Sequence, residues 1–297
     1  MPLLGLYPTR SARSLSAEVG ECYHGRKASC AARGLPFKEE KVQEFRHFAE
    51  RVARKAGAVL REHQGKIQRI EYKGDIDIVT EVDRMAETLI REAIAERYPD
   101  HEVLGEEEGL STSVSPYRWI VDPIDGTTNY AHGFPYYCVS IALSMDGEIV
   151  AGAVYHPIWD ELYSASRGAG ATLNGNPIQV SEVKELRRAL LSTGFPYDVI
   201  QSGSNYGQFK AMLTHAQGVR RAGSAALDLC QVACGRYEAF WEPGLSAWDV
   251  AAGALIVQEA GGMVTDYLGN PFDPYAREIL ASNAHLHSAI QAVFAQV

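Results

Sequence analysis

Residues 119–143 read WIVDPIDGTTNYAHGFPYYCVSIAL, in which an apolar run meets an acidic turn and a second apolar run follows. Asp122 and Asp125 stand only three positions apart here, and like charges this close repel unless a cation lies between them. Pro123 fixes its own backbone and favours an extended Asp122, while Gly126 permits a tight turn. The stretch therefore predicts a strand that ends in an acidic turn.

Two interpretations of this turn stay open from the residues alone. In the first, both carboxylates and the carbonyl of Ile124 face one concavity and bind a hard cation such as Mg²⁺, which prefers oxygen ligands. In the second, the aspartates simply form an Asx-type turn at the end of a strand.

Acids also follow two other apolar segments. Glu106, Glu107 and Glu108 come after the run in HEVLG, where the alternative is a solvated acidic loop. Asp249 begins the apolar run of AWDVAAGAL, where an acid at a helix N-terminus is favourable without any function. Three acid-bearing junctions nevertheless suit a two-metal site, whose ions lie about 3.5–4 Å apart, bind phosphate and activate water.

The first half of the chain predicts helices followed by an antiparallel sheet. Apolar residues recur at helical spacing over 45–65, and Thr80-x-x-Asp83 is a possible capping box at the start of a second helix. Asp146-Gly147 and Asn174-Gly175 then separate apolar runs and are strong hairpin signals. After residue 181 helix and strand patterns alternate, with helical runs at 223–235 and 248–261. We expect these elements to pack in layers.

The composition limits the classes of protein. The chain has 297 residues, 46% of them hydrophobic, and a net charge of −9, which argues against a nucleic-acid surface as the main function. No apolar run is long enough to cross a bilayer. Five cysteines without metal-ligand spacing predict free thiols and a cytoplasmic location. Residues 1–37 are rich in Arg, Ser, Gly and Ala and are expected to form a disordered leader, ahead of one catalytic unit over 38–297 with halves at 38–182 and 183–297.

The motifs GEE, WIVDPIDGTTNYAHGFP and WDVAAGALIVQEAGG, in this order, resemble those of the inositol monophosphatase family from about residue 40 to the C-terminus. The resemblance implies an alternating α-β-α-β-α sandwich of the type shared with fructose-1,6-bisphosphatase. It also implies about two to three Mg²⁺ ions per active site. Glu106, Asp122 and the Ile124 carbonyl resemble the ligands of the first ion, and Asp122, Asp125 and Asp249 those of the second. Asp125 and Asp249 would contact the substrate as well, with Glu107 as a supporting acid.

By the same resemblance, Thr127 positions and deprotonates the attacking water with Asp83 as its partner acid, although Asp83 is also the third helical residue of the possible capping box. Lys73 and Asp77 stand at the family's spacing, and a lysine there would offset phosphate charge. The reaction implied is direct attack of metal-activated water on a phosphate monoester, without a phospho-enzyme.

Substrate contacts are expected from three parts of the chain. A glycine-led turn that enters a helix presents N–H groups to an anion, so the amides of Gly126, Thr127 and Thr128 are candidate phosphate donors. The resemblance assigns the alcohol half of the substrate to Glu242, and it adds a second segment that consists of Gly223, Ser224 and Ala225.

The leading hypothesis is therefore a Mg²⁺-dependent phosphatase of inositol monophosphates. Phosphatases of fructose 1,6-bisphosphate, adenosine 3′,5′-bisphosphate or histidinol phosphate remain alternatives, because a few pocket contacts change specificity. A further alternative is a non-catalytic regulatory protein that keeps the fold. The resemblance also implies a homodimer and sensitivity to lithium. The expected partner is a small phosphorylated polyol, without nucleic acid or membrane.

Overall fold

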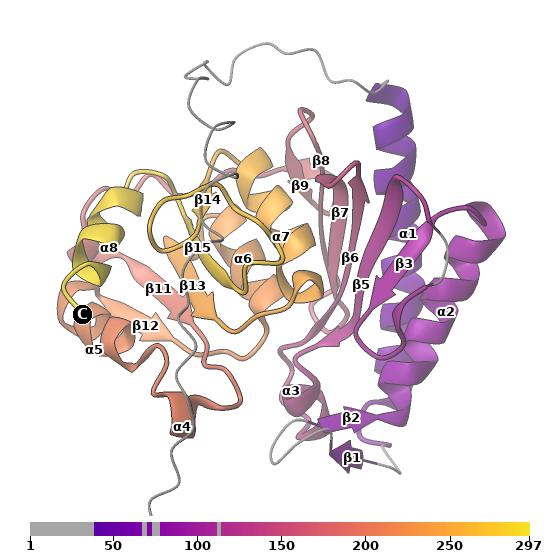
Figure 1. The fold of residues 1–297 in the computed structure, drawn as a ribbon, viewed down its shortest axis with the longest axis horizontal. Helices are drawn as coiled ribbons and strands as arrows, with labels where there is room; N and C mark the ends of the chain where they lie inside the picture. The colour runs from indigo at the N-terminus through magenta and orange to yellow at the C-terminus, as the bar shows by residue number, and fades with distance from the viewer. Residues whose placement is uncertain (1–38, 67–69, 73–77, 112–113) are drawn as a thin grey trace, which may run out of the picture. The chain divides into compact units, whose positions relative to one another are not determined.

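The computed structural model describes residues 39–66, 70–72, 78–111 and 114–297. The chain divides into two units, Met1–Pro36 and Phe37–Val297. All elements below belong to the second unit (Figure 1).

An eight-stranded sheet forms the first half of this unit. Its strands, in the spatial order β10-β9-β8-β7-β6-β5-β3-β4, are antiparallel except for the parallel pair β3–β5. Their bounds are β3 (Glu102–Gly105), β4 (Gly109–Leu110), β5 (Tyr117–Asp125), β6 (Cys138–Met145), β7 (Glu148–His156), β8 (Glu161–Ser166), β9 (Ala171–Leu173) and β10 (Asn176–Pro177).

Both predicted hairpin turns are confirmed. Asp146 and Gly147 have φ values of 51° and 85° between β6 and β7, and Asn174 and Gly175 have 50° and 79° between β9 and β10. Positive φ at both central residues matches the twist of the flanking strands, which is why Asp-Gly and Asn-Gly are favoured there.

Two helices, α1 (Glu39–His63) and α2 (Glu81–Arg97), cover one face of this sheet. The helix predicted over 45–65 thus begins six residues earlier, at Glu39, where two acids in the first turn favour a helix N-terminus. The capping box at Thr80 is confirmed, with Asp83 as the residue that returns the hydrogen bond. Ahead of α2, β1 (Ile70–Tyr72) pairs with β2 (Ile78–Thr80).

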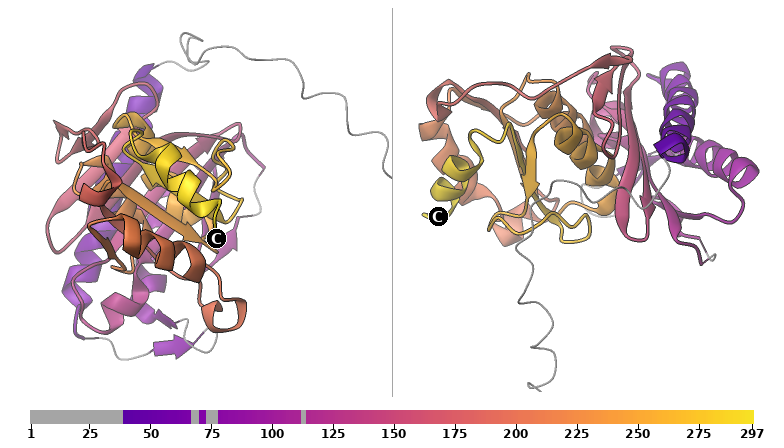
Figure 2. Two further views of the ribbon diagram at one scale, coloured as in Figure 1. Left: turned by 90° about the vertical axis from the view of Figure 1, so that its left-hand side faces the viewer. Right: turned by 90° about the horizontal axis from the view of Figure 1, so that it is seen from above.

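A five-stranded sheet in the order β12-β11-β13-β15-β14 forms the second half. Helices α6 (Ala225–Ala233) and α7 (Ala247–Glu259) lie between the two sheets, and α5 (Tyr206–His215) and α8 (His287–Phe294) cover the outer face (Figure 2, right). The strands and remaining short helices are β11 (Leu190–Thr193), β12 (Gly218–Arg220), β13 (Ala239–Pro243), β14 (Met263–Thr265), β15 (Glu278–Ser282), α3 (Thr127–Ala131), η1 (Leu186–Arg188) and α4 (Val199–Ser202).

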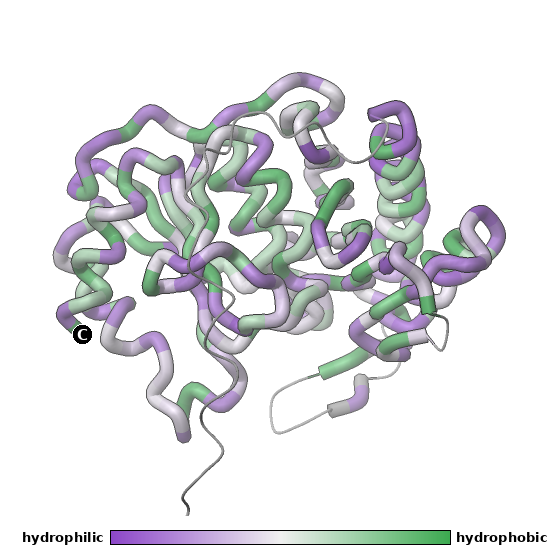
Figure 3. The backbone as a smooth tube through the Cα atoms, turned by 45° about the horizontal axis from the view of Figure 1, so that its top comes forward, coloured by the Kyte–Doolittle hydropathy of each residue, from purple (hydrophilic) through white to green (hydrophobic). Residues whose placement is uncertain are grey.

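Helix α7 is buried between the sheets because small residues let its neighbours approach. A Cβ on Gly152 of β7 would lie 3.1 Å from the Cα of Ala252, and one on Gly253 would lie 2.7 Å from the side chain of Leu229 in α6. Hydrophobic residues concentrate in the sheets and the helices between them, whereas the peripheral loops are hydrophilic (Figure 3). The alternating α-β-α-β-α order confirms the predicted fold class.

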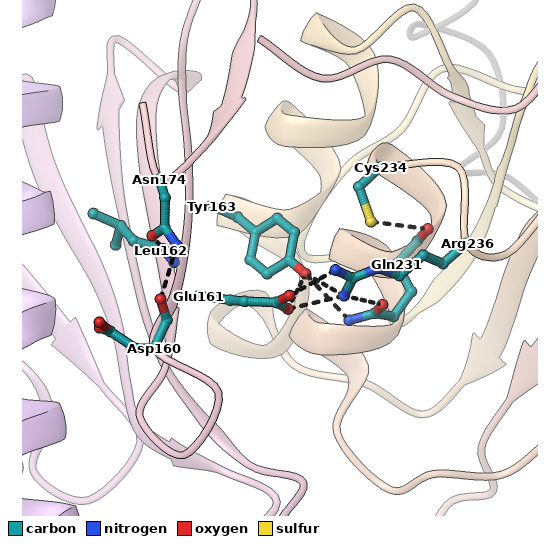
Figure 4. Close-up of polar contacts among 8 residues, drawn as sticks. All are labelled: Asp160, Glu161, Leu162, Tyr163, Asn174, Gln231, Cys234 and Arg236. Carbon is teal, nitrogen blue, oxygen red and sulfur yellow. Dashed lines mark hydrogen bonds and ion pairs between the residues drawn. The ribbon is translucent and has the colours of Figure 1, made fainter. Parts of the chain in front are cut away.

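A polar network ties the C-terminal end of α6 to β8 (Figure 4). The guanidinium of Arg236 donates to both carboxylate oxygens of Glu161, at 2.6 and 2.9 Å, and to the hydroxyl of Tyr163 at 3.1 Å. Arg236 also contacts Gln231 within α6 at 3.1 Å. A two-point arginine–carboxylate pair fixes geometry better than a single contact, so α6 is held at this end.

The described cysteines pack in the core, as expected for free thiols. Cys138 and Cys230 are buried, and Cys234 is partly buried. Among the described helices, none is both long and apolar enough to span a membrane.

Candidate active site

The acidic turn lies at the end of β5, where both aspartates point into the protein. Asp122 and Asp125 are only 1% and 7% exposed. The N–H of Ile124 donates to Asp122 Oδ1 at 2.9 Å, which is the Asx-type turn of the second interpretation. The turn does not exclude the first interpretation, because the bond from Ile124 uses only Oδ1 of Asp122.

Gly126 makes this turn possible. Its φ is +99°, and a Cβ there would lie 3.1 Å from the carbonyl oxygens of Gly223 and Tyr136. A side chain would thus meet both backbone strain and backbone atoms. The chain then enters α3, of which Thr127 is the first residue.

Helix α7 brings a third acid to the end of β5. Oxygens of Asp122, Asp125 and Asp249 lie within 4.8 Å of one another. Asp249 also accepts the N–H of Ser246 at 2.7 Å, so it caps α7 as the local alternative proposed. Capping uses Oδ2 alone and leaves the rest of the carboxylate to the cluster.

The electrostatics of the cluster favour a bound cation. Burial raises the pKa of Asp122 well above its ordinary range, and the neighbouring charges of Glu106, Asp125 and Asp249 raise it further. The pKa of Asp249 is raised by burial and then by Asp125. Buried carboxylates this close are unfavourable when ionised, unless a cation offsets their charge. An all-oxygen set of ligands fits a hard divalent ion such as Mg²⁺.

Asp125 is held by the N-terminal end of α6. Its Oδ2 accepts the Ser224 hydroxyl at 2.6 Å and the N–H of Ala226 at 2.7 Å, and its Oδ1 accepts the N–H of Ala225 at 3.3 Å. These bonds oppose the rise that burial causes in the pKa of Asp125. Ser224 is only 1% exposed, so the structure directs its hydroxyl toward this acid. The sequence had suggested only that Ser224 and Ala225 line the substrate.

Asp83 serves the helix cap and Thr127 at the same time. Its Oδ2 accepts the N–H and the hydroxyl of Thr80, at 2.8 and 2.6 Å, whereas its Oδ1 lies 3.0 Å from the hydroxyl of Thr127. The Thr127 hydroxyl is also 2.9 Å from the carbonyl of Ile124. Burial, which outweighs the bonds from Thr80, raises the pKa of Asp83 to about 6, and the charge of Glu107 adds to this.

The three glutamates after β3 differ in their surroundings. The charge of Glu106 acts on Asp122 and Asp249, which places it at the cluster, whereas that of Glu107 acts on Asp83. Glu108 is exposed and lies 3.4 Å from Arg91.

Glu87 of α2 is a residue that the sequence reasoning missed. It is fully buried and accepts the backbone N–H groups of Glu107 and Glu108, at 2.8 and 3.0 Å. The only sequence signal is its spacing of four from Arg91, which donates to it at 2.8 Å. That spacing is equally typical of an exposed helix pair.

The residues expected at the alcohol half lie nearby. Glu242 is the next-to-last residue of β13, and Gly194 faces it: a Cβ on Gly194 would lie 2.1 Å from the Glu242 carboxylate. Burial raises the pKa of Glu242 well above its ordinary range, while Arg221 lowers it. Gly223 is exposed, and the Asn129 amide donates to its carbonyl at 3.2 Å. Thr128 is exposed at the start of α3.

Several predicted positions lie outside the described residues. They are Lys73 and Asp77, proposed near the site, and the whole leader over 1–37. Asp75, for which the sequence suggested no role, lies there too.

The layered fold, with three acids gathered where β5 meets the central helices, is that of a class of metal-dependent phosphatases. A family model described as the inositol monophosphatase family matches residues 41–297. The chain belongs to this family, which confirms the resemblance and makes the chain a phosphatase by family.

Individual relatives agree with this membership. An inositol-1-monophosphatase of Synechocystis sp. is 46% identical over 263 residues, which cover 87% of this chain and 91% of that protein. A protein named Nus factor SuhB from Pseudomonas aeruginosa is 44% identical over 84% of this chain and 95% of its own length. The solved structure of inositol monophosphatase from Anabaena (Nostoc) sp. has a TM-score of 0.80 at 42% identity, over 86% of this chain and 97% of that one.

Proposed function

We propose that this protein is a Mg²⁺-dependent phosphomonoesterase that hydrolyses inositol monophosphate to inositol and phosphate. The observation that carries the proposal is the cluster of the buried Asp122 and Asp125 with the partly buried Asp249, whose ionised form is unfavourable without a cation. The relative named inositol-1-monophosphatase supports the substrate.

The acidic cluster is the proposed metal site. Asp122, Asp125 and Asp249 would hold Mg²⁺ together with Glu106 and the carbonyl of Ile124. A bound divalent ion supplies Lewis-acid polarisation of the phosphate and lowers the pKa of water.

The chain's own groups would position the reacting molecules. The Thr127 hydroxyl, 3.0 Å from Asp83, orients the attacking water and passes a proton toward that carboxylate, whose pKa near 6 suits proton transfer at neutral pH. The amides of Gly126, Thr127 and Thr128 would donate hydrogen bonds to phosphate oxygens, as expected for a glycine-led turn that enters a helix. The charge around the phosphate would be offset by Lys73. Two acids, Glu107 and Asp77, would support the site.

For the alcohol half, Glu242 is the proposed acceptor of substrate hydroxyls. Within the described part of the chain no group donates a hydrogen bond to its carboxylate, which is only partly exposed. A carboxylate that lacks donors binds hydroxyls well. Gly223, Ser224 and Ala225 would bound the same pocket on its other side.

The test is phosphate release from inositol 1-phosphate, fructose 1,6-bisphosphate, adenosine 3′,5′-bisphosphate and histidinol phosphate, each with Mg²⁺ and with excess chelator. We expect the highest kcat/KM on inositol 1-phosphate and loss of activity on chelation. A strong preference for another of the four substrates would show that inositol monophosphate is not the substrate. Activity that survives chelation would show that the reaction does not depend on a metal ion. No release from any substrate would favour a non-catalytic role.

Three further properties belong to the same proposal. A homodimer is expected to appear as twice the chain mass in solution. Lithium is expected to inhibit by competing for a Mg²⁺ position, so inhibition should weaken as Mg²⁺ is raised. A cytoplasmic location follows from the cysteine pattern alone.

A further inference from the structure

Glu87 connects α2 to the acidic loop that follows β3. It lies four residues, or about one helical turn, after Asp83, and its side chain is fully buried. Oε2 accepts the N–H of Glu107 at 2.8 Å, and Oε1 accepts the N–H of Glu108 at 3.0 Å. The carboxylate therefore binds the backbone of the loop and leaves the glutamate side chains of the loop unconstrained by these two bonds.

Arg91 completes the attachment. Its Nε donates to Glu87 Oε1 at 2.8 Å, and its Nη2 donates to the carbonyl of Gly109 at 2.6 Å. The arginine thus offsets the charge of a buried carboxylate and holds the far end of the loop. At the near end, a Cβ on Gly105 would lie 2.2 Å from Glu87 Oε1, so the backbone passes directly over the carboxylate.

This attachment opposes a repulsion that is built into the loop. Glu106, Glu107 and Glu108 are consecutive like charges, and the first two also face the acids of the site. Without an anchor, these charges would drive the loop toward solvent. Because α2 carries both Asp83 and Glu87, one rigid helix sets the distance between the water-positioning acid and the loop.

We infer that Glu87 is a positioning residue that holds Glu106 and Glu107 in place for the metal site. The inference rests on the proposed function, since it assumes that the loop supplies a metal ligand. Outer partners that orient metal ligands typically contribute about 10–100-fold to metal affinity.

The chain offers a matched control in Glu259, the last residue of α7. Its Oε1 accepts the N–H of Gly168 at 2.8 Å, and its Oε2 accepts the N–H of Gly170 at 2.9 Å. This carboxylate also joins a helix to two backbone amides of a turn, but the turn lies between β8 and β9 and carries none of the acids of the site. If the role of Glu87 is purely structural, substitution of Glu87 and substitution of Glu259 will have the same effect on Mg²⁺ binding.

The experiment titrates Mg²⁺ alone into metal-stripped wild type, E87Q and E259Q by calorimetry, with thermal unfolding in chelator as the second readout. We expect about 10–100-fold weaker Mg²⁺ binding in E87Q and a change within about 2-fold in E259Q, while both unfold at lower temperature. Equal binding by wild type and E87Q, or equal weakening in both variants, overturns the inference. If wild type itself binds no Mg²⁺, the proposed function fails, and the inference fails with it.

Should E87Q not fold, R91Q takes its place, because it removes the partner at the far end of the loop and keeps the Glu87 carboxylate. We expect R91Q to weaken Mg²⁺ binding by about 3-fold or more, which in free energy is about half of a tenfold loss. Wild-type affinity in R91Q would overturn the inference.

Discussion

Asp83 divides its two carboxylate oxygens between a structural and a chemical neighbour. One oxygen accepts two hydrogen bonds from Thr80 and so caps the N-terminal end of α2. The other oxygen lies 3.0 Å from the Thr127 hydroxyl. A proton that reaches this carboxylate thus arrives at a group that the helix cap holds in place. Its raised pKa is the consequence of burial, and it makes the stability of the metal-free protein depend on pH.

The sign of that dependence can be tested with D83N. Because the pKa of Asp83 rises from 3.8 to about 6 on folding, its contribution to stability is present below about pH 4 and is lost as the pH rises through 6. We expect the unfolding free energy of wild type minus that of D83N to fall by about 2 kcal/mol between pH 4 and 7, at about 1.4 kcal/mol per pKa unit, because a small part of the effect is already lost at pH 4.

The measurement is urea denaturation of both proteins in chelator. Burial lowers the pKa of His101 and of His156 to about 4, so these histidines change stability in the opposite direction. The contributions of the two histidines cancel in the difference between the two proteins, which leaves Asp83 and the acids on which its charge acts, such as Asp122. A difference that stays constant over this pH range would show that the pKa of Asp83 is not raised.

Asp122 is the second residue with a direct test. D122N keeps the shape and an oxygen that can accept the Ile124 N–H, but it removes one of the buried like charges. We expect turnover to fall by at least about 100-fold, the upper end of what loss of a mere outer partner costs. In chelator the variant should unfold at the same temperature as wild type or higher, because its amide cannot ionise. Near-normal phosphate release by D122N would reject its role as a metal ligand.

Among the elements, α6 fixes Asp125 at one end and is itself fixed at the other. Ser224 and the first amides of the helix bind Asp125, whereas Arg236 joins the last turn to Glu161 of β8 (Figure 4). In between, the Tyr136 hydroxyl donates to Asp228 at 2.7 Å. The helix therefore transmits the position of the sheet to a proposed metal ligand.

S224A tests this arrangement, because it removes both the N-cap of α6 and a donor to a buried acid. Loss of a serine N-cap alone costs about 0.5–2 kcal/mol of stability. We expect that loss in urea denaturation, together with weaker Mg²⁺ binding in calorimetry. S164A is the matched control: the buried Ser164 hydroxyl donates to Glu50 at 2.6 Å, away from the acidic cluster. If both variants weaken Mg²⁺ binding equally, Ser224 has no particular role at the site.

At the scale of the whole molecule, the site depends on elements from both halves of the fold, the half with the eight-stranded sheet and the half with the five-stranded sheet. Asp122 and Asp125 come from β5 of the eight-stranded sheet, Asp249 from α7 between the sheets, and Asp83 from α2 on the outer face. The acids meet because β5 ends beside the N-terminal ends of these helices. Packing of the layers is thus a condition for the proposed chemistry.

Local features of this fold were predictable from the sequence because residues within a few positions decide them. The hairpin at Asp146-Gly147 and the cap formed by Thr80 and Asp83 are of this kind. The contact from Ser224 to Asp125 spans 99 positions, and that from Glu107 to Glu87 spans 20. Neither follows from spacing, because both require knowing which helix end faces which strand end.

The central claim is that the clustered aspartates Asp122, Asp125 and Asp249 hold divalent ions. Its most direct test is an anomalous difference map, measured at the manganese edge, from crystals grown with Mn²⁺ in place of Mg²⁺. We predict density between Asp122, Asp125 and Asp249, and its absence from crystals of D122N grown in the same way. A wild-type map without density at these aspartates, at an Mn²⁺ concentration that supports phosphate release, would contradict the account.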